Sequence, residues 1–339
     1  PAANNGLVML AAALDDPTGY GRVFRDAEGD FLAVVEQKDA SPAELAIREV
    51  NTGVLAGSAS QLASLLARVG NTNAQREYYL PDALGMAVAD GLSVAVMVTD
   101  EVSDILGVND RLQLEQLERR YQIARACDLM REGVAIQDRQ RIDIRGELIC
   151  GRDVAIDVNT LFEGKVILGD GVSIGANCIL KDVEIAAGTV VHPFCHLDSA
   201  VVGSHCSVGP FSRLRPGTVL GDAARIGNFV ETKNANLGTG SKANHLAYIG
   251  DSEVGEGCNI GAGTITCNYD GANKHRTVLG DRVFVGSNST LVAPLTIESD
   301  GFVAAGSTVT KDINSAQLAV SRARQRNIDG WRRPEKSKE

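Results

Sequence analysis

The stretch VILGDGVSIGANCILKDVEI, residues 166–185, decides the fold. Its aliphatic residues Leu168, Ile174 and Leu180 recur every six positions, and Ile185 follows five positions later. A hexapeptide period of this kind is typical of a parallel β-helix, in which each repeated residue points into the core from one side of a coil. The stretch therefore predicts a solenoid of short strands.

The same register continues in both directions, from Cys150 to Val309, and most of its positions hold Leu, Ile or Val. Three hexapeptides make one triangular coil, so the 27 positions in register predict nine coils. Equivalent residues of adjacent coils stack roughly 4.8 Å apart, which suits medium-sized aliphatic side chains. This explains an aromatic content of only 4%. We place the β-helix at residues 134–321 and expect its flat faces to favour self-association.

The segments around the β-helix have other patterns. Residues 1–108 alternate strand-like runs (GLVMLAAAL, FLAVVEQ, LSVAVMVTD) with helix-like runs (SQLASLLARVG, LPDALGMAVADG), an α/β pattern. Residues 109–133 are predicted to form one linker helix, capped by Asn109 or Asp110 and ended by Gly133. Leu114, Leu117, Tyr121 and Ala124 share one face of this helix. Residues 322–339 form a basic tail, either a solvated end or an arm for an anionic ligand.

The composition narrows the class of protein. The net charge of −10 argues against a nucleic-acid partner. No signal peptide or long apolar run is visible, so membrane insertion is not expected. Seven cysteines are scattered without a CxxC pair, which favours reduced thiols in the cytoplasm over disulfides or a zinc ribbon.

The repeat also places three polar residues. Arg215 and Lys233 are 18 residues apart without a five-residue step between them, so they occupy the same corner of adjacent coils. Such a pair is either a solvated surface pair or a clamp for a phosphate. His245 follows one coil later at a nearby corner, with Tyr248 beside it. It is either a structural histidine or a base that accepts a proton from a bound amine.

An insertion interrupts the register after Thr266. The next residue in register is Leu279, and the intervening CNYDGANKHR carries Asn268, Tyr269, Lys274 and His275. An insertion that leaves the coil intact must project outward. It is either a tolerated loop or one that carries binding groups, and its polar and aromatic content favours binding.

Several longer motifs show a family resemblance. LDDPTGYGRV, EVNTGV, NAQREYYLPD, GVNDRLQL, GPFSRLRPG, GNFVETK, GSKANHLAYIGD, NIGAGTITCNYDGANKH and GWRRP run through nearly the whole chain. The chain resembles the bifunctional bacterial N-acetylglucosamine-1-phosphate uridyltransferases / glucosamine-1-phosphate acetyltransferases. That resemblance implies a left-handed β-helix, a cytoplasmic homotrimer with sites between subunits, and a role in making UDP-N-acetylglucosamine for cell-wall precursors.

The resemblance also implies roles for individual residues in acetyl transfer from acetyl-CoA to glucosamine-1-phosphate. His245 would be the general base. Arg215, Lys233, Tyr248, Asn259 and Lys274 would contact the sugar phosphate. Acetyl-CoA would be bound by a further set, of which two also orient the substrate: Ala262, Asn268, Tyr269, Ser287, Ala305 and Arg322. A backbone donor near Ala262 would stabilise the oxyanion.

The N-terminal part resembles a partial Rossmann-like nucleotidyltransferase domain. Gly21, Glu36, Asn51 and Asn109 match positions that contact UDP-N-acetylglucosamine, and Asn109 matches a magnesium ligand. The family's glycine-rich opening, its phosphate-contacting Arg and Lys, and the Asp that shares magnesium are not found in this sequence. We therefore expect a uridyltransferase domain without its N-terminal part, and acetyl transfer without uridylyl transfer.

Three other interpretations remain. Hexapeptide β-helices also carry zinc carbonic anhydrases, and His192, His196 and His205 are close in sequence, although His192 and His196 lie on adjacent sides of one coil. A non-catalytic assembly or regulatory protein is a second interpretation. Acetylation of a different amino sugar is a third, which the anionic handle required by Arg215 and Lys233 disfavours.

Overall fold

The computed structural model describes residues 6–108, 110–334 and 336, and the chain divides into two compact units, residues 1–120 and 121–339. The first unit is an α/β domain with a five-stranded sheet in the order β3-β2-β4-β1-β5. Strand β1 pairs parallel with β5 and antiparallel with β4. Its elements are β1 Gly6–Ala13, β2 Arg22–Arg25, β3 Phe31–Val35, α1 Pro42–Leu45, β4 Glu49–Ala56, α2 Ala59–Leu66, α3 Asp82–Ala89, β5 Ser93–Thr99 and the 3-10 helix η1 Val102–Ile105.

The core of the first unit joins the sheet to two helices. Met9 of β1, Leu65 of α2 and Leu84 of α3 are all buried in one apolar cluster. The three predicted strands and the two predicted helices are confirmed. Strands β2 and β4 were not predicted, because Asn51 and Gly53 interrupt the apolar pattern of β4.

The linker helix is confirmed as α4, Arg111–Arg131. Asp110 caps it, since its Oδ1 accepts a hydrogen bond from the Gln113 N–H at 2.8 Å. Asn109, the other predicted cap, lies outside the described residues. Gly133 follows the helix with φ of 102°, a backbone conformation that favours glycine.

The predicted apolar face of α4 is wrong for the part of the helix in the second unit. Tyr121 and Ala124 are exposed, whereas Gln122 and Leu129 are buried. The Gln122 side chain donates to the Ile144 carbonyl at 3.0 Å and accepts from the Ile144 N–H at 2.8 Å. The amide therefore forms hydrogen bonds with the backbone groups at the open edge of a first-coil strand. A pattern of apolar residues does not predict this contact.

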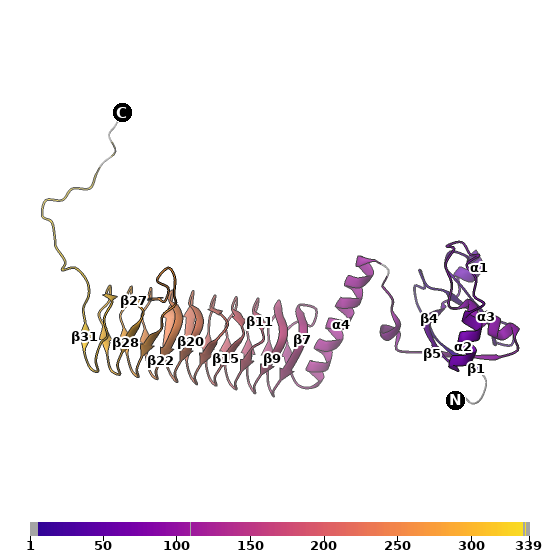
Figure 1. Ribbon diagram of the computed structural model, residues 1–339, viewed down its shortest axis with the longest axis horizontal. Helices are drawn as coiled ribbons and strands as arrows, with labels where there is room; N and C mark the ends of the chain where they lie inside the picture. Colours follow the sequence, from indigo (N-terminus) through magenta and orange to yellow (C-terminus); the bar gives the residue numbers. More distant parts are fainter. Residues whose placement is uncertain (1–5, 109, 335, 337–339) are drawn as a thin grey trace. The chain divides into compact units, whose positions relative to one another are not determined.

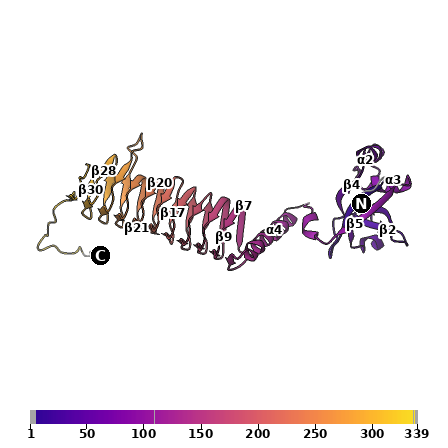
Figure 2. The same ribbon diagram turned by 90° about the horizontal axis from the view of Figure 1, so that it is seen from below.

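The second unit is a parallel β-helix whose coils stack along one axis (Figures 1 and 2). One side is an eleven-stranded parallel sheet: β6 Ala135–Ile136, β8 Ala155–Ile156, β10 Ser173–Ile174, β13 Val190–Val191, β16 Ser207–Val208, β19 Arg225–Asn228, β21 Lys242–His245, β23 Asn259–Ile260, β26 Phe284–Val285, β29 Phe302–Val303 and β31 Leu318–Ala319.

The other two sides form one sheet, because β7, β9, β20 and β22 run through the corner between them. Its strands are β7 Ile142–Cys150, β9 Thr160–Leu168, β11 Ile179–Lys181, β12 Glu184–Ile185, β14 His196–Asp198, β15 Ala200–Val202, β17 Arg213–Leu214, β18 Thr218–Leu220, β20 Glu231–Leu237, β22 Tyr248–Val254, β24 Ile265–Cys267, β25 Thr277–Leu279, β27 Thr290–Val292, β28 Leu295–Ile297 and β30 Thr308–Val309.

The predicted fold, a left-handed parallel β-helix of hexapeptide repeats preceded by an α/β domain and a long helix, is confirmed. Residues at the predicted inward positions fill its core, and Leu180, Val208 and Leu214 are fully buried. Burial of each such side chain contributes about 1.5–3 kcal/mol. The count of nine coils is too low, because the eleven-stranded side continues to β6 and β31, whose sequences lie outside the regular six-residue register.

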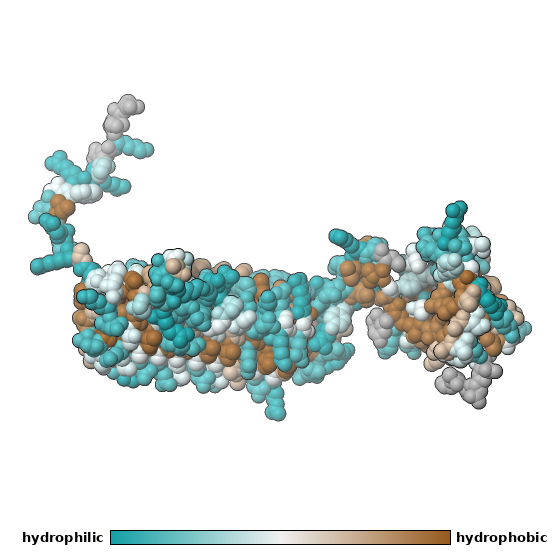
Figure 3. Space-filling view, in the orientation of Figure 1, coloured by the Kyte–Doolittle hydropathy of each residue, from teal (hydrophilic) through white to brown (hydrophobic). Residues whose placement is uncertain are grey.

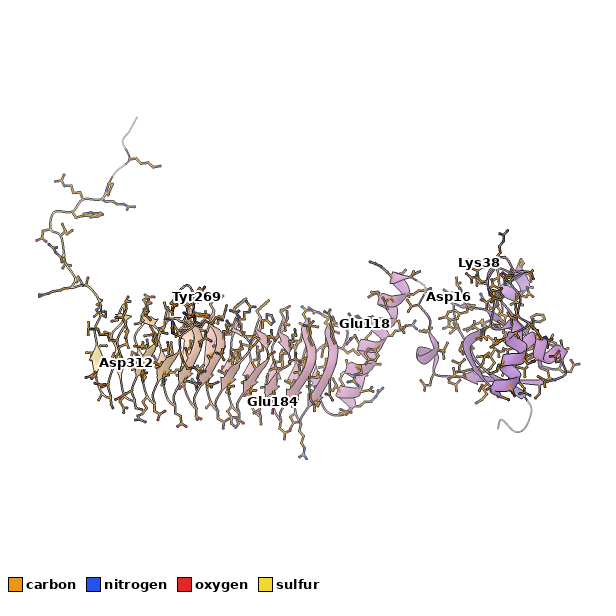
Figure 4. All side chains as sticks on the ribbon, in the orientation of Figure 1. Asp16, Lys38, Glu118, Glu184, Tyr269 and Asp312 are labelled. Atoms are coloured by element: carbon orange, nitrogen blue, oxygen red, sulfur yellow. The ribbon has the colours of Figure 1, made fainter. Side chains whose placement is uncertain are left out.

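Two segments leave the regular coils. The insertion between β24 and β25 projects outward as predicted, and Tyr269 marks it in Figure 4. The tail leaves the last coil, with Ile328 and Trp331 exposed. All seven cysteines are free thiols. Among the described residues, no helix is both long and apolar enough to cross a membrane.

Candidate functional site

Two corners of the β-helix carry most of the predicted site residues. The histidine corner is the turn at which the chain leaves the eleven-stranded side, and it holds His245. The cation corner is the next turn along the same coil, at Gly250 and Asp251. Strand register places Gly250 opposite Lys233, so that corner also holds Lys233 one coil earlier.

A row of equivalent residues runs along the histidine corner. Asn228 is paired with His245 by register, and continuing the same register brings Ala262, Ser287 and Ala305 to the same position in successive coils. Arg322 closes the row, since its Nη1 donates to the Ala305 carbonyl at 2.6 Å. The predicted acetyl-CoA-binding residues Ala262, Ser287, Ala305 and Arg322 thus lie along one edge, where small side chains leave room for an extended ligand.

His245 has a defined orientation at this corner. Its Nδ1 lies 2.9 Å from Oδ1 of Asn228, one coil earlier. Because a carboxamide oxygen only accepts hydrogen bonds, this contact assigns the hydrogen to Nδ1 and leaves the Nε2 lone pair available. The imidazole is exposed, so Nε2 is accessible to a ligand.

The cation corner stacks Arg215 and Lys233 as predicted. Leu214 and Thr232 are paired by register, and the Arg215 N–H donates to the Thr232 carbonyl at 2.9 Å. Arg215 Nη1 also contacts Glu231 Oε1 at 2.8 Å. This ion pair was not predicted, and it neutralises part of the charge of the stack.

Lys274, from the inserted loop, adds a third cation. A hydrogen bond to Lys274 and repulsion from its charge lower the pKa of Lys233, and burial and Arg215 lower it further, whereas Asp251 opposes the shift. An amino group that two neighbouring cations push toward its neutral form gains from an added anion. Arg215, Lys233 and Lys274 therefore form a cluster suited to a phosphate.

The inserted loop has an ordered base. Tyr269 and Lys274 form an isolated antiparallel bridge, and the His275 N–H donates to the Asn268 carbonyl at 2.8 Å. His275 Nε2 contacts Asp270 Oδ2 at 2.6 Å. Backbone hydrogen bonds from Asn273, together with the contact to His275, lower the pKa of Asp270. Tyr269 is 61% exposed, so its ring is available to a ligand.

The other two predicted substrate contacts lie elsewhere. Tyr248 stands on the side between the two corners, and its hydroxyl occupies the space that a Cβ at Gly250 would need. Asn259 belongs to β23 on the eleven-stranded side, between Lys242 and Phe284 in register. The structure thus brings Arg215, Lys233 and Lys274 together, but it does not bring Asn259 to them.

The two corners are separated by one side of the coil. Gly250 lies five residues after His245, and five residues of extended chain span roughly 15 Å. Among the described residues, no hydrogen bond or ion pair links His245 with Arg215, Lys233 or Lys274. One chain therefore presents two half-sites.

Sequence reasoning missed three residues that support these half-sites: Asn228, Glu231 and Asp251. Asn228 is the register partner of His245, and Glu231 lies two residues before Lys233. Asp251 follows Gly250, the register partner of Lys233. Following the register backward by 17 residues from His245 would have identified Asn228.

The first unit brings together three predicted contacts for a nucleotide sugar. A Cβ at Gly21 would lie 2.9 Å from Glu36 Oε1, and the Asn51 N–H donates to the Gly21 carbonyl at 2.9 Å. Burial and the nearby Asp82 and Asp39 raise the pKa of Glu36. The fourth predicted residue, Asn109, lies outside the described residues.

The described side chains form no group of ligands for a metal ion. Among the side chains that the structure describes, no three from His, Cys, Asp or Glu gather to hold an ion. His192, considered above as a zinc ligand, lies 3.1 Å from the Ser207 hydroxyl through its Nε2.

Comparisons with known proteins agree with this geometry. The family description "GMPPB C-terminal domain" matches residues 144–236, and "Hexapeptide repeat of succinyl-transferase" matches residues 276–311. The bifunctional protein GlmU of Pseudomonas entomophila is 55% identical over 332 residues, 98% of this chain and 73% of the relative. The GlmU of Pseudomonas putida KT2440 is 54% identical over 99% of this chain and 74% of the relative.

A solved UDP-N-acetylglucosamine acyltransferase from Campylobacter jejuni is 16% identical, with a TM-score of 0.34 over 55% of this chain and 71% of that chain, too distant to support an argument. The alignments with the GlmU proteins take in nearly all of this chain and 73–74% of each relative, and they do not confirm the expectation that the uridyltransferase domain lacks its N-terminal part. They do not confirm the expected loss of uridylyl transfer either.

Proposed function

This chain belongs to the family of bifunctional GlmU proteins, and on that premise we propose that it transfers acetyl from acetyl-CoA to the amine of glucosamine-1-phosphate. The product is N-acetylglucosamine-1-phosphate, a precursor of UDP-N-acetylglucosamine. The observation that carries the proposal is the stack of Arg215 and Lys233 with Lys274 beside it, since three cations at one corner require an anionic acceptor.

The acceptor amine must lose a proton before it attacks. In the proposed reaction, Nε2 of His245 takes that proton while Asn228 holds Nδ1. The amine nitrogen forms a bond to the thioester carbonyl carbon, and the C–S bond breaks. The acylated nitrogen then loses its second proton to solvent, and the CoA thiolate leaves with the proton that the imidazolium returns. The cation cluster holds the phosphate and so fixes the amine in place.

The attack places negative charge on the former carbonyl oxygen. The backbone N–H of Ala262 is suited to receive it, because Ala262 follows His245 by one coil and its N–H donates to none of the described acceptors. Ser287, Ala305 and Arg322 continue along the same edge and support binding of the CoA chain, with Arg322 near its phosphates. Tyr269 and Asn268 orient the donor from the loop.

The separation of the two corners supports a site shared between copies. In glucosamine-1-phosphate the amine and phosphate are on adjacent ring carbons, far closer than one side of a coil. His245 of one copy therefore acts on an acceptor held by the cations of another, in a homotrimer. Apolar residues are exposed on the visible face of the β-helix (Figure 3). The stacked rings of Phe194, Phe211 and Phe229 are also exposed, and both observations support such association.

The family name also covers a second activity, transfer of uridylyl from UTP to N-acetylglucosamine-1-phosphate. Gly21, Glu36 and Asn51 support binding of a nucleotide sugar by the first unit. Magnesium belongs to that reaction in the family, and the described residues show no ligand set for it. The free thiols support a reducing compartment, the cytoplasm.

Thiol release from acetyl-CoA tests the proposal directly. We expect release with glucosamine-1-phosphate and little with glucosamine, because only the phosphate engages the cation cluster. Equal rates with both acceptors would show that the cation cluster does not contribute to binding of the acceptor. No release from a folded trimer would favour a non-catalytic β-helix.

A further inference from the structure

Asp251 lies at the cation corner, beside Lys233 and Lys274. It follows Gly250, the register partner of Lys233, and its backbone has φ of 46°. The residue is only 8% exposed. Burial of a charged side chain and a positive φ at a non-glycine residue both cost free energy, so other contacts must stabilise Asp251 in this position.

The Asp251 carboxylate is held by two carboxamides. Its Oδ1 accepts from Asn234 Nδ2 at 2.6 Å, one coil earlier. Its Oδ2 accepts from Asn268 Nδ2, one coil later. Asn268 is the base of the inserted loop, because its carbonyl accepts from the His275 N–H. Asp251 thus ties the loop that carries Lys274 to the coil next to Lys233.

The charge of Asp251 faces the same two lysines. Burial raises the pKa of Asp251, but hydrogen bonds from Asn234 and Asn268 and the charges of Lys233 and Lys274 outweigh it and lower the pKa. The lowered pKa keeps the Asp251 carboxylate ionised at neutral pH. In return the carboxylate raises the pKa of Lys233 against the opposing effects of Lys274 and Arg215, while Glu231 is engaged with Arg215.

We propose that Asp251 is a positioning residue for the anionic acceptor, which sets the separation of Lys233 and Lys274. The inference rests on the proposed function and deepens it. Without Asp251 the loop loses an anchor, and the two lysines repel each other without a counter-charge before the phosphate arrives.

Another aspartate at the same corner shows what a purely structural role looks like. Asp182, four coils earlier, also has positive φ, but its Oδ1 accepts from the Lys165 backbone N–H at 3.0 Å. Glu253 provides a second contrast, because it anchors the far end of the loop through Arg276 Nη1 at 2.9 Å. Glu253 is not among the charges that shift the pKa of Lys233.

These contrasts define the experiment, which compares Asp251→Asn with Asp182→Asn and Glu253→Gln in the full chain. For D251N we expect KM for glucosamine-1-phosphate to rise roughly tenfold with kcat within about twofold. Lys233 binds phosphate only when protonated. Loss of the carboxylate lowers its pKa further, so the alkaline limb of kcat/KM moves to lower pH. D182N and E253Q should leave that limb in place.

A double variant separates charge from packing. In D251N with Asn268→Asp, the acid and the amide exchange places, so we expect recovery of the KM for glucosamine-1-phosphate and of the alkaline limb, measured at saturating acetyl-CoA because Asn268 also orients the donor. A uniform loss of kcat at every pH in D251N, or no change at all, would overturn the proposal. An unfolded D251N that the double variant does not rescue would also count against it.

Failure of the proposed function is distinguishable from failure of this inference. If the wild-type chain does not acetylate glucosamine-1-phosphate, the proposed function fails, and binding of inorganic phosphate by calorimetry decides the role of Asp251. Roughly tenfold weaker phosphate binding by D251N than by D182N supports it. Equal binding by the two variants overturns it.

Discussion

The early and late coils of the β-helix differ along one row of equivalent positions. In the early coils the row alternates in sign at every step, and the alternation ends only where two cations follow each other: Arg145, Glu163, Lys181, Asp198, Arg215 and Lys233. Opposite charges on adjacent strands stabilise a sheet, and like charges destabilise it. The charges in this row therefore pair with one another in the early coils, whereas Lys233 in the late coils has a like charge before it in the row and gains from an added anion.

The histidine corner shows the same division. Register places Ala176, Pro193 and Pro210 in the early coils at the position of Asn228 and His245 in the late coils. Side chains without a donor or acceptor give way to an amide and an imidazole. The backbone repeat thus determines where each side chain lies. A polar residue at a position that is apolar in the earlier coils indicates a coil that contributes to the candidate site.

Replacing His245 should have the largest effect. For His245→Ala we expect acetyl transfer to fall by roughly 10²–10⁴-fold, the usual contribution of a positioned base. The melting temperature should not change, because the imidazole is exposed and its one described hydrogen bond is to a neighbouring side chain. His196→Ala, in an early coil, is the control. Thiol release at the wild-type rate in H245A would exclude the histidine from the reaction.

Two lysines in the same row test the charge argument. Lys233→Met should raise KM for glucosamine-1-phosphate by roughly a hundredfold, because the variant removes a charge-assisted contact to the phosphate. Lys181→Met changes the same side chain at the equivalent position, between Glu163 and Asp198. Its steady-state kinetics should match the wild type. A similar KM for both variants would mean that the break in alternation has no link to the acceptor.

Much of this arrangement is predictable from the sequence, because a solenoid converts spacing into position. The six-residue step alone locates Arg215 and Lys233 at one corner. Spacing does not supply the conformation of side chains, such as the Arg215–Glu231 ion pair or the contact between His245 and Asn228. The α/β unit has no repeated spacing, so β4 was not predicted. The predicted face of α4 was wrong because the prediction used apolar residues only, whereas the polar side chain of Gln122 is buried against Ile144.

Lys274 offers a smaller effect with a defined sign. Hydrogen bonding to Lys274 and repulsion from it lower the pKa of Lys233. In Lys274→Met that pKa rises toward its ordinary value, so Lys233 stays charged to higher pH. The alkaline limb of kcat/KM should move to higher pH, opposite to D251N, although KM rises roughly tenfold at neutral pH from the lost contact. A limb that moves to lower pH, or does not move, would show that Lys233 does not control it.

The smallest expected effect is on stability, where activity and stability should diverge. Lys233→Glu extends the alternation of the early coils by one step, since a carboxylate would then follow Arg215. The new carboxylate gains Arg215 but also lies near Asp251, so thermal unfolding should occur close to the wild-type temperature, and acetyl transfer should be lost. Lys181→Glu, the matched variant, places a carboxylate between Glu163 and Asp198 and should melt lower. If K233E melted at a lower temperature than K181E, repulsion between Arg215 and Lys233 would not destabilise the free protein. The different charge patterns of the early and late coils would then have no effect on the free energy of unfolding.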